Sequence, residues 1–339
     1  MPKSGRQTWV FASAPRVISR ATVAGKNESQ GPLGTCFDIR HHDDRMGEDT
    51  WEHAERALAD EAFALALAKA NLKPEDIDLV VGADLNAQLI SYFFSLRHYA
   101  VPAMGMYAAC ASICQSLAVG ALAIDSGMAE RVLVGTSSHF STAERQFRFP
   151  TEYGAQKPPS AQRTVTGSGA AVLARTGSPI AITMATVGQV LDYGLESPWE
   201  MNAAMAPAAA ATIAAHLADT GRTLADYDCV ATGDLGFVGH EILCDLLKER
   251  GIAVPDNVTD CGMLIFDRNQ PEVYSGGSGC ACCTMVTFGY LLRKLEEGEW
   301  RRILVAATGA LLSMVSVQQQ DTIPCISHAV VFERKEDGS

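Results

Sequence analysis

Cys110 is the residue whose type and setting point most directly to chemistry. It lies in the run Met104-Gly-Met-Tyr-Ala-Ala-Cys-Ala-Ser112, between an apolar stretch and a helical pattern. Small neighbours let the backbone turn tightly there and let a ligand approach closely. At the start of a helix, the helix dipole and free backbone N–H groups favour a thiolate. We therefore expect a nucleophile or an anion-binding pocket at this turn.

The composition excludes several classes of function. The chain has 339 residues and a net charge of -12, which argues against nucleic acid as a partner because phosphate binding needs a basic face. No apolar run approaches the ~18 residues of a membrane-spanning helix, so we expect no transmembrane segment. The N-terminus leads into no signal-peptide core, so the protein is expected to stay in the compartment where it is made. The spacing of Cys280, Cys282 and Cys283 does not match zinc sites, and we expect no metal and no cofactor.

The chain repeats itself. Residues 66–85 match residues 216–235 in register, with a helix, a turn, a buried strand and an acidic residue (Asp84, Asp234) in each copy. Ala109-Cys-Ala-Ser112 is mirrored by Gly279-Cys-Ala-Cys282, and residues 169–175 by residues 328–334. Continuous apolar strands imply sheets that are covered on both faces. We predict two duplicated α/β halves, residues 1–177 with Cys110 and residues 178–339. For Asp84 and Asp234, helix capping or a turn is the favoured role.

An Ala-Cys-Ala turn in a duplicated α/β half resembles the thiolase superfamily and its condensing enzymes. A closer resemblance, running from Arg6 to Arg334, is to the family of stage V sporulation protein AD, and it is carried by segments such as "TSSHFSTAERQFRFPTEYGAQKP", "GGSGCAC" and "PCISHAVVFER". The resemblance implies a five-layer αβαβα sandwich and a homodimer. It also implies a dipicolinate binder that is peripheral to the spore's inner membrane, in the forespore or spore compartment. There it would work with other SpoVA membrane proteins on dipicolinic acid, with or without calcium.

The groups that a condensing enzyme needs beside its cysteine are incomplete in this chain. Such an enzyme requires a base and oxyanion donors, which the thiolase superfamily places on the second repeat. Where a His or Asn is expected, the chain has Asp234 and the loop Gly276-Gly-Ser-Gly-Cys280. Cys325-Ile326 resembles the thiolase Cys-Ile-Gly-Gly start, but Ser327 and His328 replace its glycines. His328 stays open as a base for Cys110.

Residues from both halves are candidates for contacting a ligand. Dipicolinate is a flat pyridine with two carboxylates, which suits guanidinium groups beside an aromatic face. The segment that starts at Arg145 offers these types, with a dimer contact as the equally weighted alternative. His139 follows a strand, where α/β folds bind ligands, and pocket lining and structural hydrogen bonding are weighed evenly for it. The predicted ligand-binding residues are Cys110, His139, Arg145, Arg148, Ser278, Cys325 and His328.

Three functions follow from these candidates. The first is a dipicolinate-binding protein that acts in uptake during sporulation and release at germination. The second is a Cys-dependent acyltransferase or condensing enzyme working through a Cys110 thioester. The third is a scaffold with a vestigial active site, in which Cys110 is only a tightly packed small residue.

Overall fold

The computed structural model describes residues 3–147 and 157–335. In the first half the main elements are β3 (Arg16–Ala24), α2 (Trp51–Lys69), β5 (Leu79–Ala83), α3 (Ile90–Leu96), β6 (Ala103–Gly105), α4 (Ser112–Asp125), β7 (Arg131–Ser138) and β9 (Gly167–Ala174). In the second half they are β10 (Ile180–Thr186), α6 (Met201–Thr220), β11 (Cys229–Thr232), α7 (Gly236–Glu249), β12 (Val258–Asp260), α9 (Cys280–Val286), α10 (Leu292–Glu296), β14 (Arg302–Ala310) and β15 (Cys325–Arg334).

The same topology occurs twice. The strand path runs β12-β11-β14-β15-β10 in one half and continues as β3-β9-β7-β5-β6 in the other. Read from the first strand of each half, the two orders are identical. The halves meet through the pairing of Ala181 in β10 with Arg16 in β3. The division at residue 177 stays a prediction, and it falls between the end of β9 and the start of β10.

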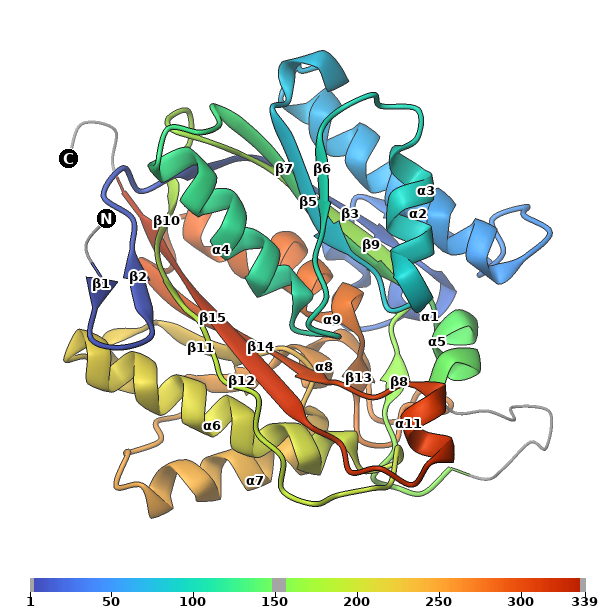
Figure 1. The fold of residues 1–339 in the computed structure, drawn as a ribbon, viewed down its shortest axis with the longest axis vertical. Helices are drawn as coiled ribbons and strands as arrows, with labels where there is room; N and C mark the ends of the chain where they lie inside the picture. Colours follow the sequence, from blue (N-terminus) through green and yellow to red (C-terminus); the bar gives the residue numbers. More distant parts are fainter. Residues whose placement is uncertain (1–2, 148–156, 336–339) are drawn as a thin grey trace.

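The layers form the predicted αβαβα sandwich. Helices α2 and α3 cover one face of the first sheet, and α6 and α7 cover one face of the second (Figure 1). Helices α4 and α9 lie between the two sheets, and their apolar side chains join strands of both in the largest core cluster. Helix α9 is buried on every side, which explains its apolar composition, whereas α4 keeps a partly exposed stripe at Gln115, Val119 and Leu122.

Shorter elements complete the fold around this sandwich. They are β1 (Lys3–Ser4), β2 (Thr8–Val10), α1 (Lys26–Ser29), β4 (Ile39–Arg40), α5 (Phe140–Phe147), β8 (Arg163–Thr164), α8 (Cys261–Ile265), β13 (Gly277–Ser278) and α11 (Met314–Gln318). Strands β8 and β13 pair in parallel, Arg163 with Gly277 and Thr164 with Ser278. This small ladder joins the two halves beside the Cys110 turn.

The duplication extends to individual hydrogen bonds. Asp78 Oδ2 accepts the backbone N–H groups of Glu130 and Arg131 at 2.7 and 3.0 Å. Asp228 Oδ2 accepts those of Arg301 and Arg302 at 2.7 and 2.8 Å. Each aspartate therefore fixes the start of the neighbouring strand in its own half, as expected for copies of one ancestral unit.

Two general features of the chain bear on the later argument. None of the helices in residues 3–147 and 157–335 has the length and apolar content that crossing a bilayer requires. All ten cysteines are free thiols.

Candidate functional site

The Cys110 turn is held in a strained conformation just before α4. Ala109 has a φ of 47°, a left-handed conformation that costs a non-glycine residue about 1 kcal/mol. Ser112 secures the turn, because its Oγ accepts the N–H of Ala108 at 2.9 Å and donates to the carbonyl of Ala109 at 2.7 Å. Gly309 of β14 lies against the turn, and a Cβ there would collide with the Ala108 carbonyl oxygen. A residue of the second half, Gly309, thus leaves the space in which the Cys110 turn of the first half packs.

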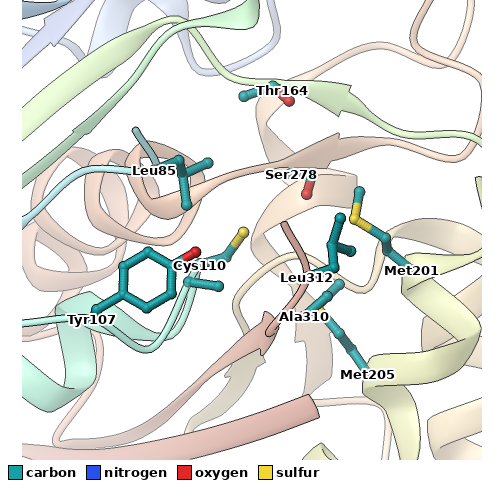
Figure 2. Close-up of a pocket in the computed structure, with 10 residues that line it drawn as sticks. Leu85, Tyr107, Cys110, Thr164, Met201, Met205, Ser278, Ala310 and Leu312 are labelled. Atoms are coloured by element: carbon teal, nitrogen blue, oxygen red, sulfur yellow. The ribbon is translucent and has the colours of Figure 1, made fainter. Parts of the chain in front are cut away.

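Cys110 lines a narrow pocket between the two halves. Figure 2 shows its Sγ directed into this pocket, with Tyr107 and Leu312 on either side and Ser278 beyond it. The volume open to the centre of a water molecule is about 20 Å³, room for about one ordered water. The lining is mostly apolar and comes from many elements: Leu85, Tyr107, Ala109, Cys110, Thr164, Met201, Met205, Ser278, Ala310 and Leu312. None of these lining residues is a cation.

Asp234 forms the buried polar floor behind the cysteine. Its carboxylate accepts hydrogen bonds from Thr308 Oγ1 at 2.5 Å, Ser278 Oγ at 3.0 Å and the Gly279 N–H at 3.1 Å. The Cys110 thiol lies beside this carboxyl group and interacts with it electrostatically. Burial raises the pKa of Asp234 to about 6, although these donors oppose the shift. Asp234 therefore connects the turn before α4, the start of α9 and strand β14.

The electrostatic setting of Cys110 corrects the expectation of a favoured thiolate. Burial raises the pKa of the Cys110 thiol well above its ordinary value, and the Asp234 carboxylate raises it further. The Gly279 N–H acts in the opposite direction but is outweighed. Cys110 lies just before the N-cap of α4, which begins at Ser112, but burial and the neighbouring Asp234 carboxylate are the largest influences on the pKa of its thiol.

His328 and Cys325 do not line the pocket. His328 Nδ1 accepts the backbone N–H of Gly188 at 3.1 Å, and burial lowers the pKa of the ring to about 4. The buried Cys325 thiol donates to the carbonyl of Ile323 at 3.5 Å. Cys325 belongs to the apolar cluster that β15 forms with α6. Of the predicted ligand residues that the structure describes, only Cys110 and Ser278 share the pocket lining.

His139 and Arg145 also lie outside the pocket lining. Both ring nitrogens of the buried His139 are used: Nε2 contacts the Asp44 carbonyl at 2.8 Å, and Nδ1 accepts the Ser141 N–H at 3.1 Å. These bonds support the structural alternative for His139. Arg145 on α5 forms a partly exposed ion pair with Glu52 at 3.1 Å. Arg148 lies outside the described residues. A ligand contact by any of these residues stays a prediction.

Several site residues were not expected from the sequence. Met201 and Met205 lie one turn apart at the start of α6 and form one apolar wall, and the half-exposed Tyr107 lies opposite Ser278. Asp234 was expected to cap a helix or stabilise a turn, yet its bonds are tertiary. Its repeat partner Asp84 does stabilise a local turn, accepting the N–H groups of Asn86 and Tyr92. The alignment of the two repeats pairs Asp234 with Asp84 and so marked Asp234 as a candidate. It could not show that the two carboxylates accept hydrogen bonds from different parts of the fold.

No group of three or more His, Cys, Asp or Glu residues is placed to hold a metal ion within residues 3–147 and 157–335. The described site offers a protonated thiol, a buried carboxyl group, the hydroxyl groups of Tyr107, Thr164 and Ser278, and apolar walls.

The raised pKa of Cys110 predicts slow alkylation. At pH 7.5, iodoacetamide should modify Cys110 more slowly than a free cysteine, because only the thiolate reacts. Asp234→Asn removes the negative charge and should speed the reaction about tenfold, which corresponds to one pKa unit. Mass spectrometry of the Cys110 peptide gives the rate, with the partly exposed Cys36 as internal reference. Equal rates in both proteins would contradict the assigned role of Asp234.

Comparison with solved structures supports the fold. The structure is similar to 3-oxoacyl-(acyl-carrier-protein) synthase III from Aquifex aeolicus, with a TM-score of 0.57 and 17% identity over 94% of this chain and 99% of that one. It is also similar to OleA of Xanthomonas campestris, with a TM-score of 0.62 and 16% identity over 95% and 97% of the two chains. These likenesses confirm the predicted thiolase-like architecture.

Sequence comparison identifies the family. The family model described as "Stage V sporulation protein AD (SpoVAD)" matches residues 5–333. The chain is also 48% identical to stage V sporulation protein AD of Bacillus subtilis (strain 168) over 334 residues, which cover 98% of each protein. This protein therefore belongs to the stage V sporulation protein AD (SpoVAD) family.

Proposed function

We propose that this sporulation protein binds dipicolinic acid non-covalently in the Cys110 pocket. The observation that carries the proposal is the buried Asp234 carboxyl group next to the Cys110 thiol, because a carboxyl group in this place raises the pKa of the thiol and so favours recognition of a ligand over nucleophilic attack. Among the described residues, no histidine lines the pocket that could take the thiol proton. A protonated thiol and hydroxyl groups can hold a ligand without reacting with it.

The pocket chemistry suits a flat ring with carboxyl groups once the pocket opens. Tyr107, Met201 and Met205 offer an aromatic face and polarisable thioethers to the ring. Ser278, Thr164 and a protonated Asp234 can donate hydrogen bonds to carboxylate oxygens. The present space holds about one water, so binding requires side chains at the mouth to move. Tyr107 is the best placed to do so because half of its surface is exposed.

In the cell, we propose that the protein acts with other SpoVA membrane proteins at the forespore side of the spore's inner membrane. It would take part in dipicolinate uptake during sporulation and in its release at germination, with the free acid or its calcium complex as the ligand. Membership of the stage V sporulation protein AD family supports this assignment.

A Cys-dependent acyltransferase is the second candidate function. The apolar walls around Cys110 favour it, since they would suit an acyl chain, and so does the similarity to 3-oxoacyl synthase III. The raised pKa of the Cys110 thiol weighs against it. The two functions differ in whether a covalent bond to sulfur forms.

Isothermal titration with dipicolinate, with and without calcium, tests the binding proposal. We expect saturable binding that weakens about tenfold in Cys110→Ala and in Tyr107→Ala, the loss that removing about 1.4 kcal/mol of contact produces. Met128→Ala, a change at a side chain that is 85% exposed, is the control and should bind normally. Absence of binding to the wild type, together with a mass shift of Cys110 after exposure to acyl-CoA, would favour the acyltransferase instead.

The pKa of Asp234 predicts a pH dependence of this binding. Because burial raises that pKa to about 6, the carboxyl group loses its proton above about pH 6 in the free protein. A bound anion favours the protonated form, so binding takes up one proton. Affinity should fall up to about tenfold per pH unit between pH 6 and 8. Asp234→Asn should flatten this slope in the same titration series, and an unchanged slope would exclude Asp234 as the linked group.

We also propose that the protein is a homodimer that pairs through β6. Strand β6 ends the sheet path, and all three of its residues are exposed. Large exposed apolar side chains lie on it and beside it: Ile90, Phe93, Phe94, Met104 and Tyr107. A free strand edge with an apolar border is suited to pairing with a second copy.

Sedimentation velocity tests the dimer. The wild type should sediment as a dimer, and Met104→Lys, which places a charge on the exposed edge, should shift it toward the monomer. Val315→Lys is the matched control, because Val315 is similarly exposed (59% against 53%) but lies on α11. A monomeric wild type, or dissociation by the control variant alone, would overturn this arrangement.

A further inference from the structure

An arginine occupies the equivalent position in both halves, but its surroundings differ between them. Arg131 begins β7 and Arg302 begins β14, and each donates from Nη1 to a backbone carbonyl, that of Asp76 at 3.5 Å and that of Asp226 at 3.2 Å. Arg302 pairs in the ladder with Glu333, and Arg131 pairs in the same place with Ala174. The equivalent position thus carries a carboxylate in one half and a methyl group in the other.

This difference determines whether a neighbouring carboxylate neutralises the charge of each guanidinium group. Glu333 Oε1 contacts Arg302 Nε at 2.6 Å and Arg222 Nη2 at 3.2 Å, and only 14% of the Glu333 side chain is exposed. Arg131 has no carboxylate partner within the described residues. The nearby Asp78 carboxylate instead accepts the backbone N–H groups of Glu130 and Arg131. One half therefore contains a close ion pair at this position, whereas the Arg131 guanidinium of the other half has only the longer-range attraction of the Asp78 carboxylate.

The first half has an open groove beside Arg131, at the place where the second half has the Glu333 carboxylate beside Arg302. A groove of about 660 Å³ runs beside Arg131, between the end of α2, the loop before β7 and the end of β9. Its cations are Lys69, Arg131 and Arg175, and its acid is Glu130. Lys69 is paired with Asp38 at 2.6 Å, whereas Arg175 donates from Nη2 to the carbonyl of Ile124 at 3.0 Å. In a protein of net charge -12, this groove is a local excess of positive charge.

We propose that this groove is an anion-binding site in which one carboxylate or phosphate group binds Arg131 where Glu333 binds Arg302. Guanidinium groups bind such oxyanions with two parallel hydrogen bonds, and Arg131 and Arg175 both have N–H groups left for this. The anion comes either from a small molecule or from a phospholipid headgroup. The site is separate from the Cys110 pocket, because the two have no lining residue in common.

Titration with inorganic phosphate, followed by the NMR signals of the arginine Nε–H groups, tests the site. The wild type should show saturable shifts at Arg131 and Arg175. Ala174→Glu supplies the carboxylate from within the chain and should weaken binding about tenfold or more, as should Arg131→Gln. Vesicles of phosphatidylglycerol form the second arm: binding with the same dependence on these variants identifies a headgroup as the source, and binding of free phosphate alone identifies a small anion.

Glu333→Ala is the reciprocal variant. It leaves Arg302 and Arg222 without their carboxylate and should create a comparable phosphate site in the second half. Circular dichroism of each variant confirms folding before titration. No binding of phosphate or vesicles to the wild type, binding that Ala174→Glu and Arg131→Gln both leave unchanged, or a folded Glu333→Ala protein without the new site would overturn the proposal.

Discussion

The structure depends on the burial of two helices, α4 and α9, between two sheets. Because α9 is buried on every side and α4 over most of its surface, the backbone before each must fit closely against the opposite half. Gly309 provides that fit for the Cys110 turn, since any side chain would collide with Ala108. The close fit strains the backbone at Ala109 and leaves the Asp234 carboxyl group at the floor of the pocket with little access to water. Every property of the pocket follows from this enclosure.

Enclosure also determines the chemistry of Cys110. A thiol becomes nucleophilic when a cation or base favours its ionised form. Here the group facing the sulfur is the Asp234 carboxyl, itself held by Thr308, Ser278 and Gly279. The Asp234 carboxylate raises the free energy of ionising the thiol, whereas the neutral thiol beside it favours the ionised form of the carboxyl group. The thiolase-like architecture is retained while the balance of charge at its centre favours a protonated thiol.

Duplication explains both the regularity of the molecule and its functional asymmetry. Asp78 and Asp228 have kept the same backbone contacts, which are needed wherever a strand begins next to its neighbour. Asp84 and Asp234 have not: one stabilises a local turn, and the other faces Cys110. Ala174 and Glu333 differ in the same manner. Positions that serve the shared architecture kept the same contacts, whereas Asp234 beside the Cys110 pocket and Ala174 beside the Arg131 groove differ from their counterparts in contacts or in residue type.

The sequence by itself determined the fold, because register, periodicity and small-residue turns are local properties that both copies display. It also identified Cys110 and Ser278 as neighbours of one site through their places in the two repeats. It could not determine what faces the cysteine. Asp234 lies 124 positions further along the chain, and only the packing of one half on the other brings its carboxyl group to the sulfur. The same packing directs His328 to Gly188 and brings Met201 and Met205 to the pocket wall. Side-chain direction and burial are tertiary properties, and they decide the pKa of a thiol.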